Sequence, residues 1–172
     1  NLFDAIGHSF STVAIGGFST HDASLGYYVN QPMVEVVATI FMLLAGANFA
    51  LHYLAIRRVS LESYRHDEEF LTYIKGFVVI GVITVLYLIN TGFFVEWDEA
   101  IIHGIFQAVS IGTTTGFTTV DYDQWPAVIP VMLLFASFIG GCAGSTGGGM
   151  KVIRFLLLLK QGTREIFKLI HP

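Results

Sequence analysis

The stretch Thr113-Thr-Thr-Gly-Phe-Thr-Thr119 decides the fold of this chain. It lies at the end of the segment 100–120, which is largely apolar and contains no Asp, Glu, Lys or Arg. Hydroxyl groups and a glycine thus stand where a membrane span should be most apolar. Irregular backbone at membrane depth is tolerated only where protein buries it or where it lines a water-filled cavity. We therefore expect a re-entrant pore loop whose backbone carbonyls bind a cation.

The composition is that of a membrane protein. Of the 172 residues, 53% are hydrophobic and only 13% are charged. Three uncharged stretches, 36–56, 76–95 and 124–150, are long enough to cross a hydrocarbon core of about 30 Å. Each is predicted to be a transmembrane helix, the third with an interruption. Two further uncharged stretches, 5–21 and 100–120, contain many Gly, Ser and Thr and are predicted to be re-entrant hairpins.

The expected helix limits follow from local signals. Pro32 is placed to open the first span, which should run without a break to about Ile56. The second span is expected from about Phe70 to Val95. The third should start near Ala127.

The placement of charge predicts an orientation. The nine Lys and Arg fall in three places, which are the connection 57–75, the segment 151–154 beyond the third span, and the tail 160–168. By the positive-inside rule these segments are cytoplasmic. The remaining segments carry eight acids and no base, so we place them outside, where they would concentrate cations. These acids are Asp4, Asp22, Glu35, Glu96, Asp98, Glu99, Asp121 and Asp123.

An internal repeat gives the strongest signal of organisation. Residues 16–20 match residues 115–119 at an offset of 99, and residues 4–8 match residues 99–103 at an offset of 95. The difference of four residues is about one helical turn. Each copy should be a short helix, an extended Gly/Thr loop and then a span, with the short helices at about 4–14 and 98–110. Only the second copy follows a span of its own, which suggests a fragment.

The loops have the chemistry of an ion filter. To aim successive carbonyls at one axis, the backbone must leave strand geometry, and glycine reaches positive φ without steric cost. Gly17 and Gly116 are the candidates for that conformation, and Phe18 and Phe117 are expected to wedge the loops against their neighbours. Each short helix would point its partly negative C-terminus toward the cation. An ordinary surface loop is the alternative, which the recurrence of the pattern disfavours.

The third span should break at a glycine-rich loop. Residues 140–149 include six glycines, and each costs about 1 kcal/mol relative to alanine inside a helix. The preceding residues 127–139 make only about 20 Å of helix, so the break lies inside the membrane, beneath the filter. A packing seam against another helix is the alternative role.

Other polar residues are assigned more ordinary roles. His8 and His103 recur at matching places, and we expect hydrogen bonds or packing within each repeat rather than metal ligation. Glu35 is either an acid at the outer mouth or part of a solvated helix start. Cys142 is the only cysteine, which excludes an internal disulfide and any multi-cysteine metal site.

Three motifs closely resemble the TrkH branch of the Trk/Ktr/HKT potassium transporters. They are Thr12-Val-Ala-Ile-Gly-Gly-Phe-Ser-Thr20, Ser110-Ile-Gly-Thr-Thr-Thr-Gly-Phe-Thr-Thr119 and Gly144-Ser-Thr-Gly-Gly-Gly-Met-Lys151. The resemblance implies an all-α membrane fold in which four helix–pore-loop–helix repeats of one chain surround a central pore. On this basis residues 1–58 end one repeat, 59–69 form a cytoplasmic connection, and 70–172 form the next repeat.

The resemblance also assigns residues to the potassium path. It places the filter backbone at Ile15, Gly16, Gly17, Phe18, Thr113, Thr114, Thr115, Gly116 and Phe117. It makes the glycine-rich loop a gate that obstructs the pore, formed by Gly140, Gly141, Gly144, Ser145, Thr146, Gly147, Gly148, Gly149 and Lys151. Ser145 and Thr146 would face the permeation path. Ser19 and Thr118 replace the second glycine of the potassium-channel signature, so selectivity over sodium should be weaker.

The implied setting is the bacterial inner membrane, with the filter loops facing outside. The resemblance implies a homodimer that binds a cytosolic nucleotide-binding regulatory subunit. Potassium is the only metal expected, as the permeant ion, with no transition metal, cofactor, nucleic acid or enzymatic activity. Three alternatives stay open, which are an intramembrane serine hydrolase using Ser145 with a histidine, a less selective potassium/sodium symporter pore, and two chains that together form one pore.

Overall fold

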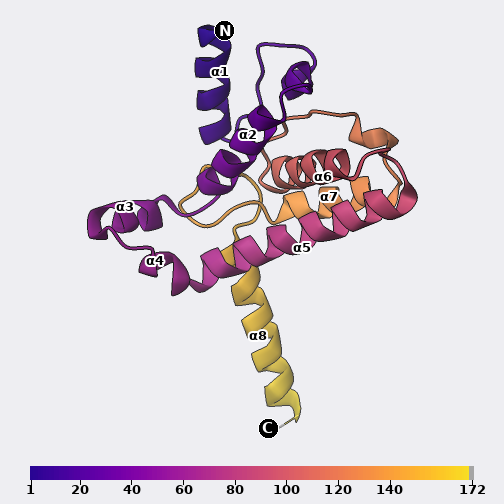
Figure 1. Cartoon of the computed structure of the whole chain (residues 1–172). Helices are drawn as coiled ribbons and strands as arrows, with labels where there is room; N and C mark the ends of the chain where they lie inside the picture. Colours follow the sequence, from indigo (N-terminus) through magenta and orange to yellow (C-terminus); the bar gives the residue numbers. More distant parts are fainter. Residues whose placement is uncertain (171–172) are drawn as a thin grey trace.

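The computed structural model describes residues 1–170, which form eight α-helices and two short 3-10 helices (Figure 1). An all-α fold is therefore confirmed. In chain order the elements are α1 (Leu2–Val13), η1 (Ser24–Tyr28), α2 (Pro32–Ala45), α3 (Phe49–Arg58), α4 (Glu62–Arg65), α5 (Glu68–Thr91), α6 (Trp97–Gly112), η2 (Tyr122–Gln124), α7 (Val128–Phe138) and α8 (Val152–Ile170).

Two short helices, α1 and α6, precede the two Gly/Thr loops as predicted. α1 has 12 residues and α6 has 16, so the four-residue difference between the copies is one extra turn of the second helix. The side chain of Asn1 accepts a hydrogen bond from the Asp4 amide at the start of α1. α6 carries Asp98 and Glu99 in its first turn, where acids are favoured by the helix dipole.

The second predicted span is one continuous helix. α5 has 24 residues, or about 36 Å of helix, which is enough to cross a membrane. Its N-terminus is capped by Asp67, whose side chain accepts from the Phe70 amide, and it ends at Gly92 with φ 64°. One side of α5 packs along α6 and meets α7. The other side exposes apolar residues, as expected of a face turned to lipid or to other membrane helices: Val78, Val79, Val82, Ile83, Leu86 and Ile89.

The prediction of a continuous first span was wrong. The chain forms α2 and α3, which meet at an angle of 96°. The bend is stabilised by distant backbone groups, because the Gly46 carbonyl accepts from the Cys142 amide at 2.8 Å and the Phe49 amide donates to the Gly144 carbonyl at 3.1 Å. The Asn48 side chain then caps α3 by accepting from the Ala50 amide. α5 is thus the one described helix that is long and apolar enough to span alone, and α2 with α3 qualifies only as a bent pair.

The third span is interrupted where predicted, but its continuation is longer than expected. α7 covers 11 residues, or about 16 Å of helix, and the irregular segment 139–151 follows. The chain then forms the 19-residue helix α8, where only a basic tail was expected. α8 extends away from the other helices and ends near the C-terminus (Figure 1).

Candidate functional site

The two Gly/Thr loops have the same unusual backbone. Ile15 and Gly17 have positive φ values of 52° and 67°, and Thr114 and Gly116 have values of 68° and 86°. Both pairs are related by the offset of 99 found in the sequence. The expectation for Gly17 and Gly116 is confirmed, whereas Ile15 and Thr114 were not predicted to leave the usual region. A β-branched residue at positive φ is strained, and such strain persists only where the surroundings enforce it.

This alternation suits a row of carbonyl ligands. In an ordinary strand successive groups point to opposite sides. When every second residue is left-handed, successive carbonyls can point toward the same side. Carbonyls in that arrangement can replace the hydration shell of a cation. The strands also touch, because a Cβ atom placed on Gly17 would lie 2.0 Å from the carbonyl oxygen of Thr115. Two of the expected filter strands therefore stand side by side.

Buried polar contacts hold the second loop. The Ser110 hydroxyl donates to the Phe117 carbonyl at 2.6 Å, and the hydroxyls of Thr113 and Thr115 are 2.7 Å apart. Phe117 is fully buried and its ring lies near His8 of α1. The predicted packing of this side chain against neighbouring elements is therefore confirmed. The same expectation fails for Phe18, whose side chain is 83% exposed because no described element covers it.

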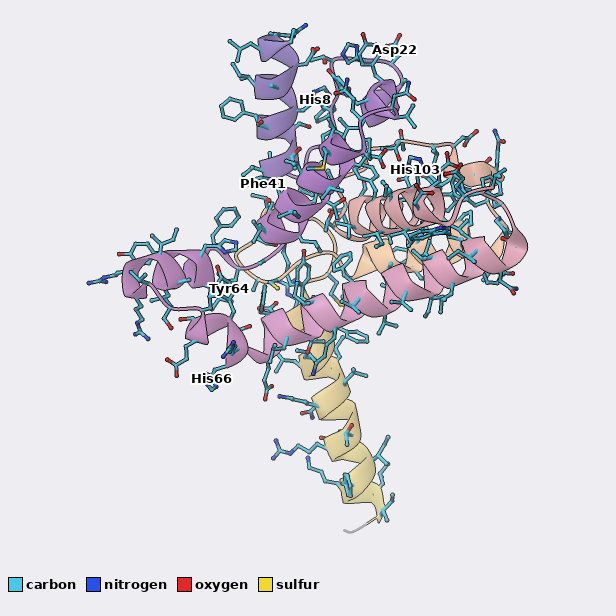
Figure 2. All side chains as sticks on the ribbon, viewed as in Figure 1. His8, Asp22, Phe41, Tyr64, His66 and His103 are labelled. Atoms are coloured by element: carbon cyan, nitrogen blue, oxygen red, sulfur yellow. The ribbon has the colours of Figure 1, made fainter. Side chains whose placement is uncertain are left out.

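The two matching histidines lie on the two short helices, His8 on α1 and His103 on α6 (Figure 2). His8 on α1 hydrogen-bonds the Ser19 hydroxyl at 2.9 Å, and His103 on α6 approaches Thr119 at 3.3 Å. His103 also contacts the Glu35 carboxylate at 3.0 Å. The predicted hydrogen bonding within each repeat is confirmed. Within residues 1–170, no cluster of three or more His, Cys, Asp or Glu is arranged to hold a metal ion.

Both predicted roles of Glu35 were wrong. Its side chain is 1% exposed and lies in the interface between α2 and α6. Proximity to Pro32 suggested a solvated helix start, but α2 crosses the second short helix and brings Glu35 behind the second loop. The first repeat thereby supplies a carboxylate to the second.

A second carboxylate lies behind the first loop. Asp4, in the first turn of α1, accepts from the hydroxyls of Thr20 at 2.8 Å and Tyr28 at 3.1 Å, and His21 approaches it at 3.3 Å. The bond from Thr20 contributes most to lowering the pKa of Asp4 from 3.8 to about 2, with smaller contributions from Tyr28 and His21, while partial burial opposes it. Asp4 is therefore a fixed negative charge at neutral pH.

The glycine-rich segment 139–151 joins both loops on their other side. The Thr146 hydroxyl donates to the Val13 carbonyl at 2.8 Å, at the C-terminal end of α1. The Gly148 amide donates to the Thr114 hydroxyl at 2.8 Å. Glycine at position 148 allows this approach, since a Cβ there would lie 2.9 Å from the Thr114 hydroxyl oxygen. Within the segment, a Cβ on Gly140 would lie 2.3 Å from the Gly148 carbonyl oxygen.

The two hydroxyl residues of this segment differ in their surroundings. Thr146 is exposed beside the end of α1, whereas the Ser145 hydroxyl donates to the Cys142 carbonyl at 2.6 Å within the segment. Lys151 lies 3.5 Å from that hydroxyl and also donates to the Gly147 carbonyl. No hydrogen bond among the described residues links Ser145 to a histidine, as a serine hydrolase of the expected kind would require.

Sequence reasoning missed one residue of this region, Glu69 on α5. Its buried carboxylate accepts from the amides of Ala143 and Ile153. An acid in a first helical turn beside a charged connection gives no sign of burial, so the sequence carried no signal for this contact.

Helices with an apolar outer face, two short helices that precede strained Gly/Thr loops, and a glycine-rich break are together typical of an α-helical membrane protein. The sequence matches the TrkH family, described as cation transport protein, over residues 1–172. The chain belongs to this family, which is a transporter family and not an enzyme family.

Named relatives agree with this assignment. The chain is 50% identical over 172 residues to the Trk system potassium uptake protein TrkH of Escherichia coli K12, and 47% identical over 175 residues to the TrkH of Halomonas elongata. It covers 35% of the length of each, which is about a third. The crystal structure of the potassium transporter TrkH from Vibrio parahaemolyticus matches 100% of the chain and 37% of that protein, with 48% identity and a TM-score of 0.95.

Proposed function

We propose that this chain supplies two of the four filter strands of a potassium uptake pore, together with the intramembrane gate of that pore. The observation that carries the proposal is the matched alternation of positive φ at Ile15 and Gly17 and at Thr114 and Gly116. Two strands with this geometry in contact offer carbonyl oxygens to a cation. The names of the relatives support potassium as the ion.

In this proposal the ion is bound by the backbone of Ile15 to Phe18 and Thr113 to Phe117. The partly negative C-termini of α1 and α6 favour a cation there, and Asp4 adds a fixed charge behind the first strand. Ser19 and Thr118 leave the loops without a second glycine, which favours weaker discrimination against sodium. The remaining two strands belong to further repeats of the same polypeptide.

The proposed gate is the segment from Gly140 to Lys151. Its contacts with Val13 and Thr114 support a position across the inner end of the filter. We place the protein in the bacterial inner membrane, with the filter outside and the basic segments in the cytoplasm. There, a second copy and a cytosolic nucleotide-binding regulatory subunit are the proposed partners.

The filter assignment is tested by Gly116→Ser in the full-length protein. Gly116 has φ 86°, so a serine there introduces backbone strain, and no atom of the described residues lies within 4 Å of its added Cβ. Placing an L-residue there costs about 1–2 kcal/mol. We expect membrane insertion to persist and potassium uptake to fall at least tenfold in cells that lack other uptake systems.

Gly92→Ser is the matched control. Gly92 has φ 64° and equally open surroundings, but it ends α5 away from the loops. The same local strain there should leave uptake within twofold of wild type. Normal uptake by inserted Gly116→Ser protein, or an equal loss in both variants, would refute the filter assignment.

A further inference from the structure

One carboxylate oxygen joins three separate segments of the chain. Glu69 is the second residue of α5, and its Oε1 atom accepts from the Ala143 amide at 2.8 Å and from the Ile153 amide at 2.9 Å. Ala143 lies in the glycine-rich segment and Ile153 lies in the first turn of α8. Glu69 is 7% exposed, so its carboxylate is largely removed from water.

The neighbouring acid shows that this arrangement is particular to Glu69. Glu68 also lies in the first turn of α5, where the helix dipole favours an acid. Its carboxylate is exposed and contacts Lys160 on the surface at 2.6 Å. Glu69 instead turns inward, and burial of a carboxylate is costly unless donors surround it. The two amides meet that need, and hydrogen bonds to a charged acceptor are stronger than neutral ones.

The two donor amides need hydrogen-bond acceptors from elsewhere in the chain. The first amides of a helix have no partner within the helix, so Glu69 caps α8 from another element. Ala143 precedes the residues that contact the filter loops, since Thr146 reaches Val13 and Gly148 reaches Thr114. Glu69 therefore fixes both ends of the segment 143–153 while the middle of that segment lies against the filter.

We propose that Glu69 is a positioning residue, a latch that holds the glycine-rich segment across the pore and ties its position to that of α8. This inference rests on the proposed function, because it assigns a closing role to that segment. A displacement of α8 strains the Ile153 bond on the same oxygen that holds Ala143. Movement of the helix and release of the segment are thus coupled at one atom.

The test uses the full-length protein in proteoliposomes and compares single-channel potassium currents of Glu69→Ala, Glu69→Gln and Glu68→Ala. The alanine variant should raise open probability at least tenfold, a change equivalent to about 1.4 kcal/mol. Glutamine keeps an acceptor oxygen without the charge, so it should raise open probability only two- to threefold. Glu68→Ala removes the same charge from the same turn and breaks only the exposed ion pair with Lys160 of α8, and a pair of this kind contributes little at a surface. It should leave the open probability within twofold of wild type.

Hydrogen exchange separates the latch from the pore assignment. The Ala143 and Ile153 amides should exchange at least tenfold faster in Glu69→Ala than in wild type, whether or not current is measured. Unchanged exchange, an unchanged open probability in a conducting protein, or an equal rise in Glu68→Ala overturns the latch. Absence of potassium current in the wild type overturns the proposed function instead. If the alanine variant fails to insert, a wild-type open probability in Glu69→Gln overturns the latch.

Discussion

The contact between the two proposed filter strands gives a quantitative prediction for Gly17→Ala. The added Cβ would lie 2.0 Å from the Thr115 carbonyl oxygen, and ordinary contact begins near 3.4 Å. The strands must therefore separate by about 1.4 Å, or the carbonyl must rotate away from its direction. The positive φ of Gly17 adds about 1–2 kcal/mol of strain for an L-residue.

Either response disturbs the spacing of the carbonyl ligands. A filter selects by the number and geometry of the oxygens that replace the hydration shell of the ion. A shift of these oxygens by more than 1 Å should therefore weaken the discrimination between potassium and sodium. We expect the ratio of potassium to sodium uptake to fall at least tenfold in proteoliposomes that contain the full-length Gly17→Ala protein. Insertion is checked by size-exclusion chromatography of the purified protein.

Gly92→Ala provides the matched control. Gly92 shares the positive φ, at 64°, but it ends α5 away from the loops, and its added Cβ would meet no described atom within 4 Å. The same backbone strain without the contact should change the uptake ratio by less than twofold. A folded Gly17→Ala protein with wild-type selectivity would refute the reasoning that the two strands form one ion path.

Two further predictions concern the carboxylates behind the loops. His103→Ala should lower the free energy of unfolding of the full-length protein by about 3 kcal/mol, since it leaves the buried Glu35 carboxylate without a partner. His66→Ala, which breaks an exposed contact, should cost below about 1 kcal/mol in the same thermal unfolding assay, and equal costs would contradict the pairing. Asp4 has a folded-state pKa of about 2, below the ordinary 3.8, so its stabilisation is complete above about pH 4 and disappears as the pH falls toward 2. The thermal stability lost in Asp4→Asn should therefore shrink over that interval, and a constant difference would contradict the assigned pKa.

Several features followed from the sequence because their causes are local. The apolar stretch of α5 favours a helix, in which its backbone hydrogen bonds are satisfied internally, and six glycines in residues 140–149 disfavour one. The repeat identified both Gly/Thr loops, and glycine's freedom of φ identified Gly17 and Gly116 within them. The histidine contacts could be predicted because a histidine recurs at the matching position in both copies of the repeat.

Only the tertiary structure decided how these parts meet. Hydropathy predicted an unbroken first span, because nothing within residues 36–56 shows that amides and carbonyls of the glycine-rich segment replace the lost helical bonds at Gly46 and Phe49. The burial of Glu35 and Glu69 depends on donors far away in the sequence. The positive φ of Ile15 and Thr114 runs against the preference of these residue types, so the sequence around them does not predict it. Local preference thus set the helices and the glycine positions, whereas long-range hydrogen bonds set the bend and the burial of the acids.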